Sequence, residues 1–505
     1  MNEKTIYFLL FLVSISVFGI ALSAFINGDF FSDDYSYFEL LQAKTIAQTG
    51  FPDYDNSLVV GSNRFVFMPI YEYILGITYA LFGSVFALKI LQALLLALIP
   101  VAVFRLSYEL RGEHFPALLS AMIGGFVPVI WQLSSNSLSK IPIVMILMLF
   151  STEFYLKSLS NKKFLGLFYI SFIILSLTSN TSILFVCAIA FSIFLSSIDN
   201  KKINGTEIEL LSFCLAVAIF IIIITYGGQI SNIGTKVIWL NTPNQVLSLE
   251  YQDFDLASLI YSLGIFPMIY GSYSLYLLTT QQESKKRDYV IMSFILMGLF
   301  LLWLKMVPWK IGFSVLGIFL AVQFTDFFIL LRRGINRSKI SRFKQPIYYL
   351  AIVFFVIGSL IPSVFYAKSS VENTIDQNIV DAIMFLKENS KDSEAVAIHP
   401  KESHFFEYLA FRKVILDSNY IALTSPEGRY LELEKIFSEN FETNAREILD
   451  EYNIKYIFLT QLAKKDYNIS ELSYAKGSPF FEIIYNDGDN IIYKYNRILN
   501  ESNGN

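Results

Sequence analysis

The chain has 505 residues, of which 54% are hydrophobic, 16% aromatic and only 16% charged, and its mean hydropathy is +0.50. A soluble chain of this length would carry far more charge, so the composition excludes an ordinary soluble protein and predicts a polytopic α-helical membrane protein. The net charge of −4 and the lack of a basic tract argue against a nucleic-acid partner.

Apolar runs long enough to cross a hydrocarbon core of roughly 30 Å occur throughout residues 1–366. Eleven membrane spans are predicted, at 5–25, 84–106, 115–134, 139–157, 163–179, 181–198, 208–226, 256–279, 289–307, 309–331 and 346–366. The first is too long for the apolar region of a signal peptide and no small-residue cleavage site follows it. We therefore expect it to be a retained helix.

An acidic pair, Asp33 and Asp34, follows directly on the first span. Ionised carboxylates are costly next to hydrocarbon, so a pair at the exit of a span is a candidate functional site. A structural alternative is that the pair caps a helix over 35–48, where carboxylates satisfy exposed amides and complement the helix dipole. The two roles are compatible, since a cap also fixes geometry.

The segment 67–82 is ambiguous, because it is apolar but short, begins near Pro69 and carries Glu72. It either spans the membrane or lies in the interface as an amphipathic helix. Its length, the proline and the glutamate favour the interfacial helix. In that case the acidic pair and the start of the span at 84–106 lie on the same side of the membrane.

Lysines and arginines lie in alternate connections between the predicted spans, so these connections fall on one side of the membrane. They lie in the connections that hold Arg105 and Arg111, Lys157 with Lys162 and Lys163, Lys201 and Lys202, 285–287, and 332–344. By the positive-inside rule this side is cytoplasmic. If the segment 67–82 lies in the interface, the loop with the acidic pair is extracytoplasmic. If that segment spans the membrane, the loop is cytoplasmic. The C-terminal region is extracytoplasmic in either case.

From about residue 367 the long apolar runs end and the chain becomes charged and mixed. Helical spacing at 379–389 and 444–452 alternates with short apolar strands at 395–398, 414–416 and 455–460. This pattern predicts a small α/β domain. We therefore expect a membrane domain at 1–366, with an outer catalytic loop at 26–83, and a soluble extracytoplasmic domain at 367–505.

The order of these features resembles the GT-C superfamily of integral-membrane glycosyltransferases, with protein-mannosyltransferase, aminoarabinose-transferase and RgtA-like members closest. The resemblance rests on the acidic pair after the first span, the Arg-x-x-x-x-Pro-x-Tyr segment from Arg64 to Tyr71, the sequence Leu81-Phe82-Gly83-Ser84, Pro128 with the 134–139 loop, and the C-terminal segments 379–389, 395–400 and 412–417. It is weak through the later spans.

The resemblance implies a donor sugar on a polyprenyl phosphate in the bilayer and a glycan, lipid or protein acceptor outside the cytoplasm. Transfer would be a single displacement with inversion, in which an aspartate takes a proton from the acceptor hydroxyl. Asp33 or Asp34 is the expected base, and which of the two matches the family residue is open. A neighbouring carboxylate raises the proton affinity of the base.

Other charged residues are candidates for substrate binding. Glu39 lies on the same predicted helix as the acidic pair, where a plain surface position is the alternative. Arg64 and Lys310, with Lys305 as a further candidate, suit a lipid phosphate by charge. The two lysines lie in a break between spans that faces outward against the positive-inside trend. The alternative for Lys310 is an interfacial anchor beside Trp309.

No cofactor is expected. Metal-dependent members of the superfamily carry a second acidic residue in the loop after the third span, and the corresponding 134–140 segment has no carboxylate. Binding of a divalent metal is therefore left open, although that loop offers it no carboxylate ligand. The three histidines, His114, His399 and His404, are too few and too scattered for a zinc site, and Cys187 and Cys214 are expected to be small apolar residues within helices.

Two other functions are compatible with a multi-span protein. A transporter or flippase of lipid-linked saccharides should show ionisable or Gly/Pro-interrupted mid-membrane segments and paired repeats, whereas the acidity here concentrates at one face. A polysaccharide polymerase also has many spans and large outer loops, but those loops usually depend on arginines more than on an early acidic pair. The early acidic pair favours the transferase.

Overall fold

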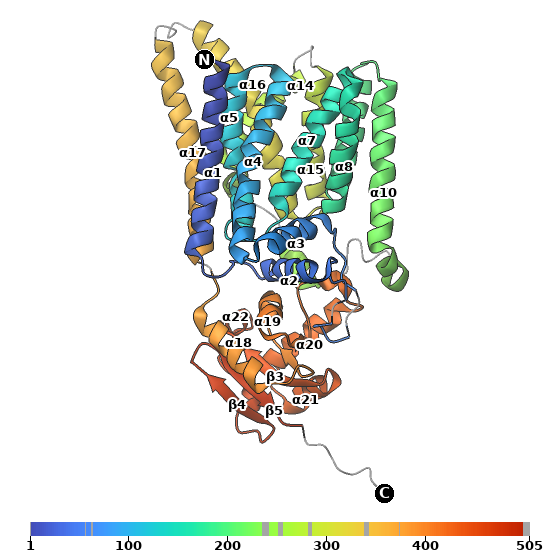
Figure 1. The fold of residues 1–505 in the computed structure, drawn as a ribbon, viewed down its shortest axis with the longest axis vertical. Coiled ribbons are helices and arrows are strands. Elements are labelled where there is room, and N and C mark those ends of the chain that lie inside the picture. Colours follow the sequence, from blue (N-terminus) through green and yellow to red (C-terminus); the bar gives the residue numbers. More distant parts are fainter. Residues whose placement is uncertain are drawn as a thin grey trace. The chain divides into compact units, whose positions relative to one another are not determined.

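The computed structural model describes residues 2–55, 57–61, 64–234, 242–250, 256–280, 285–337, 343–372 and 374–497. Contacts divide the chain into two compact units, drawn in Figure 1. Unit 1 comprises Met1–Ser32, Met68–Thr225 and Leu249–Asn373, and unit 2 comprises Asp33–Phe67, Tyr226–Ser248 and Thr374–Asn505. The expected outer loop is thus shared between the units, and the domain division at residue 366 stays a prediction.

Unit 1 is a bundle of helices that run side by side (Figure 1). Its helices are α1 (Glu3–Asn27), α3 (Ile70–Phe82), α4 (Val85–Arg111), α5 (His114–Gly125), α6 (Pro128–Ser134), α7 (Ile141–Ser160), α8 (Leu165–Thr178), α9 (Ser182–Ile198), α10 (Gly205–Ile233), α13 (Leu256–Leu263), α14 (Ser272–Thr280), α15 (Lys286–Trp303), α16 (Trp309–Arg337) and α17 (Lys344–Glu372). A π-helical turn, Pro267–Gly271, joins α13 to α14.

Each predicted span falls on one of these helices or on an interrupted pair, which confirms the polytopic helical fold. In the described part of the chain, six helices are long and apolar enough to cross a membrane, or seven if the bent pair α5–α6 is one span. The other predicted spans fall on α8, α9, α13–α14 and α15, which are shorter, interrupted or less apolar.

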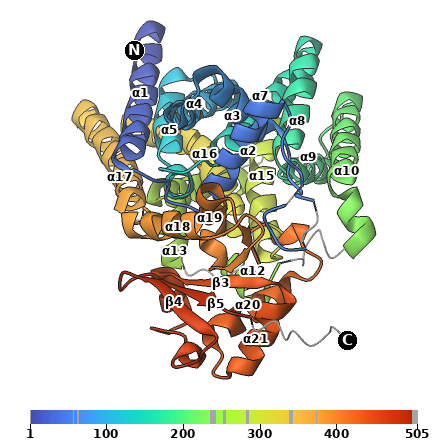
Figure 2. The same ribbon diagram turned by 60° about the horizontal axis from the view of Figure 1, so that its bottom comes forward.

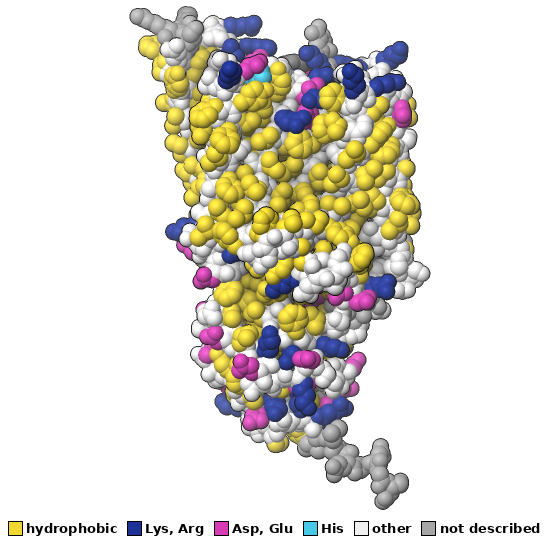
Figure 3. Space-filling view, viewed as in Figure 1, with side chains coloured by type: hydrophobic (Ala, Val, Ile, Leu, Met, Phe, Trp, Pro, Cys, Tyr) yellow, Lys and Arg dark blue, Asp and Glu magenta, His cyan; other side chains and the backbone are white. Residues whose placement is uncertain are grey.

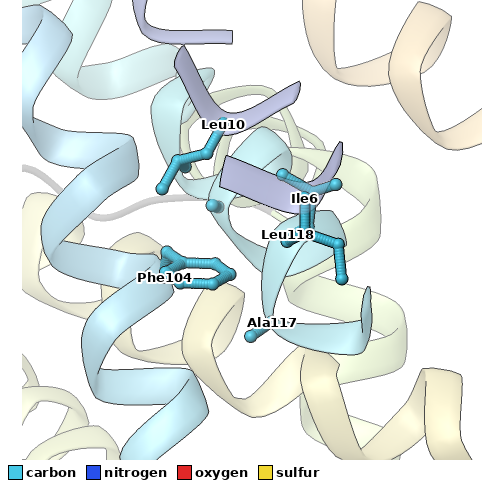
Figure 4. Packing of buried hydrophobic residues seen from close by; sticks show 6 residues of the cluster. Ile6, Leu10, Phe104, Ala117 and Leu118 are labelled. Atoms are coloured by element: carbon cyan, nitrogen blue, oxygen red, sulfur yellow. The ribbon is translucent and has the colours of Figure 1, made fainter. Parts of the chain in front are cut away.

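Apolar side chains fill the bundle wherever helices face one another. In Figure 4, Ile6 and Leu10 of α1 pack against Phe104 of α4 and against Ala117 and Leu118 of α5, and all five are buried. Within a membrane, such contacts stabilise the bundle through van der Waals packing between the helices. Tight sites along the same helices require glycine.

The clearest glycine requirement lies at the bend between α5 and α6. A Cβ on Gly124 would lie 2.8 Å from Val103, and one on Gly125 would lie 2.6 Å from Pro100. Pro128 then begins α6, at an angle of 42° to α5. Proline lacks the amide that would continue the preceding helix, so the span is broken here.

Ion pairs gather at one end of unit 1, where Figure 3 shows lysines and arginines above a broad hydrophobic band. Arg111 of α4 bonds to Asp326 of α16 and, at 2.8 Å, to Asp288 of α15. Other pairs at this end are Arg287–Glu109, Lys286–Glu207 and Arg332–Glu113. The basic connections that the charge pattern assigned to one side therefore do meet in space.

The same contacts settle the ambiguous segment α3. At one end of the bundle, Glu3 at the start of α1 lies 3.1 Å from His114, just beyond the end of α4. At the other end, Lys89 near the start of α4 donates to the carbonyls of Phe25 and Gly28. Helices α1 and α4 are thus antiparallel, so α3 between them does not cross the bundle. The spanning alternative is thus wrong, and the position of α3 in the membrane interface stays a prediction.

Unit 2 contains a five-stranded sheet in the order β2-β1-β3-β5-β4 (Figure 2). Its elements are α2 (Tyr35–Thr49), α12 (Asn244–Glu250), α18 (Gln377–Asn389), β1 (Ala395–Ala397), α19 (Ser403–Ala410), β2 (Lys413–Val414), α20 (Pro426–Ser438), α21 (Glu442–Glu451), β3 (Ile454–Leu459), α22 (Gln461–Asp466), β4 (Phe481–Asn486) and β5 (Ile491–Tyr495). Strands β1, β2 and β3 are parallel, while β5 is antiparallel to both β3 and β4. The predicted small α/β domain is confirmed.

The outer loop contributes directly to this unit. Val59 forms a parallel bridge with Val414 of β2, and Arg429 of α20 donates to the carbonyls of Val60 and Gly61. Helix α2 packs on α19, with the ring centroids of Tyr37 and Phe405 separated by 4.7 Å. Residues 33–67 and the C-terminal region therefore form one folded unit.

Candidate active site

The exit of α1 is held by the 134–140 loop within unit 1. The Asn136 side chain donates to the Phe30 carbonyl at 2.8 Å, and the Ser32 amide donates to the Asn136 carbonyl at 2.9 Å. A Cβ on Gly28 would lie 2.4 Å from Asn136, so only glycine allows this approach. The backbone that leads into the acidic pair is thus fixed by hydrogen bonds.

Asp33 caps the helix that follows it. One of its carboxylate oxygens accepts the Ser36 amide at 3.1 Å, and the other accepts the Ser36 hydroxyl at 2.5 Å. An aspartate that accepts an amide in the first turn satisfies a group that has no partner within the helix. The structural interpretation of the pair therefore holds for Asp33.

Asp34 instead binds the beginning of α19, which lies far along the sequence but in the same unit. Its carboxylate accepts the amide of Phe405 at 2.9 Å and that of His404 at 3.3 Å. Surrounding protein atoms desolvate the carboxylate and raise its pKa to about 6, against the lowering effects of His404 and the two amides. The residue nevertheless keeps partial exposure to solvent.

A buried cluster adjoins Asp34 on α19. His404 Nδ1 lies 3.1 Å from Glu407 Oε2, and the side chains of both residues are at most 3% exposed. Asp417, which is fully buried, completes a group whose ligand atoms all lie within 4.8 Å of one another. Two oxygen donors and one nitrogen donor at this spacing are able to hold a metal ion.

Charges within the cluster change the proton affinities of its members. Burial lowers the pKa of His404, but the Glu407 hydrogen bond and the charges of Asp34 and Asp417 raise it more, to a net value of about 9. Burial raises the pKa of Glu407 to about 7, against the hydrogen bond with His404. Without a bound cation, the imidazolium is thus the main positive charge facing these carboxylates.

Glu402 is a further acidic group near the start of α19. Its carboxylate accepts the Thr460 hydroxyl at 2.5 Å, and burial together with the charge of Asp34 raises its pKa to about 8. At neutral pH it is therefore mostly protonated. It adds a proton donor to this region without adding a full negative charge.

Glu39 is not on the surface of α2, contrary to the expected alternative. It is fully buried, among residues that include the buried neighbours Phe38 and Leu40. The helical period placed it correctly on α2 but could not show that this side of the helix is covered. A solvated surface role is therefore wrong, and substrate binding by Glu39 stays a prediction.

Arg64 lies at the surface of unit 2. Its guanidinium pairs with Asp55 at 3.2 Å with both side chains more than 70% exposed, and its carbonyl accepts the Gln229 side chain. An exposed pair of this kind is worth about 0–1 kcal/mol. The guanidinium can therefore exchange its partner for a phosphate at little cost.

Lys305 and Lys310 lie in unit 1, at the break between α15 and α16. Lys305 adopts the left-handed conformation at φ 56°, and the amides of Lys305 and Met306 close the end of α15 on Leu302 and Leu301. Both lysine side chains are exposed. The predicted break between spans is thus confirmed, whereas phosphate binding stays a prediction.

Sequence reasoning missed the role of His404, Glu407 and Asp417 as a group. His404 and Glu407 are three residues apart, which places them on one face of α19, and this spacing was the available signal. Asp417 reaches them only because β2 follows α19 and returns along the sheet. Arg412, which begins the segment 412–417, pairs with Asp392.

Comparison with known structures identifies the fold. The chain matches the oligosaccharyltransferase of Archaeoglobus fulgidus tethered to an acceptor peptide with a TM-score of 0.67 at 13% identity, over 91% of this chain and 69% of that one. It matches ArnT from Cupriavidus metallidurans bound to undecaprenyl phosphate with a TM-score of 0.52 at 10% identity, over 98% of both chains.

A third match is the mycobacterial arabinofuranosyltransferase AftD, with a TM-score of 0.59 at 13% identity, over 98% of this chain and 42% of that one. The sequence matches no family model and no curated protein. The structural neighbours are GT-C glycosyltransferases, and at these identities the likeness establishes a shared fold. The resemblance to GT-C glycosyltransferases that the motifs predicted is therefore confirmed for the fold.

Proposed function

We propose that the chain is a multi-pass membrane glycosyltransferase that moves a sugar from a polyprenyl-phosphate donor to an extracytoplasmic glycan, lipid or protein acceptor. The observation that carries this proposal is the acidic pair Asp33-Asp34 directly after α1, in a chain with the GT-C fold. ArnT with undecaprenyl phosphate and the archaeal enzyme with its acceptor peptide support these classes of donor and acceptor.

The reaction that suits this pair is a single displacement with inversion. Asp33 or Asp34 takes the proton of the acceptor hydroxyl, whose oxygen forms the new bond to the anomeric carbon. The bond from that carbon to the phosphate oxygen breaks, and polyprenyl phosphate leaves with the electron pair. Because phosphate is a good leaving group, the enzyme mainly aligns the reactants and removes one proton.

Arg64 and Lys310 are the proposed phosphate-binding residues, with Lys305 as a third. Each of the three side chains is exposed. Arginine offers a bidentate fork to phosphate oxygens, and lysine offers a compact charge. Glu39 stays a proposed substrate-binding residue of α2. The sidedness is also proposed: unit 2 and the acidic pair are extracytoplasmic, since the basic connections lie at the opposite end of α1.

The experiment that tests this function measures transfer from a polyprenyl-phosphate sugar by the purified chain, with the donor concentration varied. We expect Arg64→Ala and Lys310→Ala to raise the KM for the donor roughly tenfold or more, because a hydrogen bond to a charged group is worth about 1.5–3 kcal/mol. The KM for the acceptor should not change.

A matched control is Lys435→Ala, which removes an exposed cation of α20. It should leave both KM values unchanged. If wild-type protein transfers no sugar from any polyprenyl-phosphate donor, the proposed function is wrong. If transfer occurs but the Arg64 and Lys310 variants behave like the control, only the phosphate-binding assignment fails.

A further inference from the structure

The buried group on α19 points to a ligand that the proposed reaction does not require. We propose that His404, Glu407 and Asp417 form a binding site for a divalent transition-metal ion, Zn²⁺ or Mn²⁺, within unit 2. The inference concerns the folded unit itself and does not depend on the proposed transferase activity.

The geometry of the three residues suits one shared ion. Each offers one ligand atom, and all of these atoms lie within 4.8 Å of one another. His404 and Glu407 are 2% exposed and Asp417 is fully buried. Ligands that surround one ion at about 2.0–2.2 Å lie at most about 4.4 Å apart, so ligand atoms within 4.8 Å of one another need only a small shift to share an ion. The side chains are therefore already gathered around a common point.

A second observation is an unsatisfied oxygen of Glu407. Its Oε1 atom is buried and accepts no hydrogen bond, while Oε2 faces His404 Nδ1 at 3.1 Å. Within the described residues, no lysine or arginine pairs with this carboxylate. A buried carboxylate oxygen without a partner is destabilising, because the hydrogen bonds to water that it loses on burial are not replaced. A cation bound by the cluster would supply the missing partner.

Neighbouring groups orient the proposed ligands. The Asn419 amide donates to Asp417 Oδ1 at 2.9 Å, and the Asn419 side chain lies 3.4 Å from His404 Nε2. Metal ligands in proteins are commonly held by such outer contacts. One imidazole with two carboxylates suits Zn²⁺ or Mn²⁺, whereas Ca²⁺ and Mg²⁺ prefer oxygen ligands alone.

The proposed ion would join two separate segments of unit 2. His404 and Glu407 belong to α19, and Asp417 follows β2. The amides of His404 and Phe405, at the start of α19, also hold the Asp34 carboxylate. Metal binding would therefore stabilise the fold of unit 2 and fix the backbone that positions Asp34.

The test uses the full-length protein in detergent, first analysed for metal content and then stripped with a chelator. We expect wild-type protein to rebind about one equivalent of Zn²⁺ or Mn²⁺ and its Tm to rise on rebinding, because a ligand that binds only the folded state stabilises it. Glu407→Gln and Asp417→Asn should weaken this binding at least roughly tenfold. Mg²⁺ and Ca²⁺ should not replace the ion.

His399→Gln is the matched control, since it removes a second buried histidine that lies 3.4 Å from a carboxylate, Asp466. It should bind the metal as wild type does. The proposal is overturned if stripped wild-type protein binds neither Zn²⁺ nor Mn²⁺, or if neither ion raises its Tm. Binding by Glu407→Gln and Asp417→Asn as tight as that of wild type would also overturn it, because the ion would then lie elsewhere.

Discussion

Sugar transfer is expected to fall by a factor of about 10² or more when the proposed base of the pair Asp33-Asp34 becomes asparagine, because a positioned general base contributes roughly 10²–10⁴ to the rate. Asparagine keeps the size of the side chain but cannot accept the proton of the acceptor hydroxyl. The measurement is kcat for transfer from a polyprenyl-phosphate sugar by Asp33→Asn and Asp34→Asn.

The structure separates this effect from loss of stability. Asp33→Asn keeps an oxygen that can accept the Ser36 amide, and asparagine caps helices about as well as aspartate does. In Asp34→Asn, one of the amides of His404 and Phe405 loses its carboxylate oxygen, at a cost of about 1–3 kcal/mol. A measured Tm therefore shows how much of each loss in kcat reflects unfolding.

The matched control is Asp376→Asn, which alters an aspartate that caps α18 in the same unit. It should leave kcat unchanged. The variant that loses transfer while keeping its Tm identifies the base. If both members of the pair transfer sugar as well as wild type and the control, neither aspartate is the base.

Arg111→Ala is expected to destabilise the helical bundle by about 3–5 kcal/mol. The guanidinium is 17% exposed and bonds to Asp288 and Asp326, which are 5% and 14% exposed. Removing one member of a largely buried ion pair leaves the other charges without compensation. The measurement is the unfolding free energy, or the shift in Tm, of full-length protein in detergent.

Arg332→Ala provides the comparison, since its pair with Glu113 is exposed and should contribute about 0–1 kcal/mol. A triple variant, Arg111→Met with Asp288→Asn and Asp326→Asn, should regain much of the lost stability because it removes all three charges. An Arg111→Ala protein as stable as Arg332→Ala would mean that these contacts do not hold α4, α15 and α16 together.

The membrane architecture could be predicted from the sequence because its determinants are local. Runs of apolar residues locate the helices, and the alternation of lysines and arginines groups their ends. The inference that α3 does not span needed only its length, Pro69 and Glu72, and the antiparallel arrangement of α1 and α4 agrees with it. Strands β1, β2 and β3 were recognised in the same way, from short apolar runs, whereas β4 and β5 were not predicted.

The candidate site could be predicted only in part, because long-range contacts build it. Asp34 meets His404 across 370 positions of sequence, and Val59 meets Val414 across a similar separation. No periodic pattern links such residues. The sequence therefore identified the acidic pair, but it neither distinguished Asp33 as the helix cap nor revealed the cluster beside Asp34.

Burial explains why the surroundings of Glu39 and His404 could not be predicted from the sequence. Helical spacing showed that Glu39 lies on α2, but its burial depends on the three-dimensional packing around that helix. Similarly, His404 seemed isolated in the sequence because its neighbours Glu407 and Asp417 are ordinary acidic residues until β2 returns beside α19.

The most direct test follows a labelled polyprenyl-phosphate sugar after incubation with the wild-type protein in lipid vesicles and an acceptor extract. We expect the bond to the lipid phosphate to break and nuclear magnetic resonance to find the sugar on the acceptor with its anomeric configuration inverted. A sugar that crosses the vesicle membrane still joined to its lipid would indicate a flippase, and retained configuration would exclude single displacement. Either result would contradict catalysis by the acidic pair as proposed.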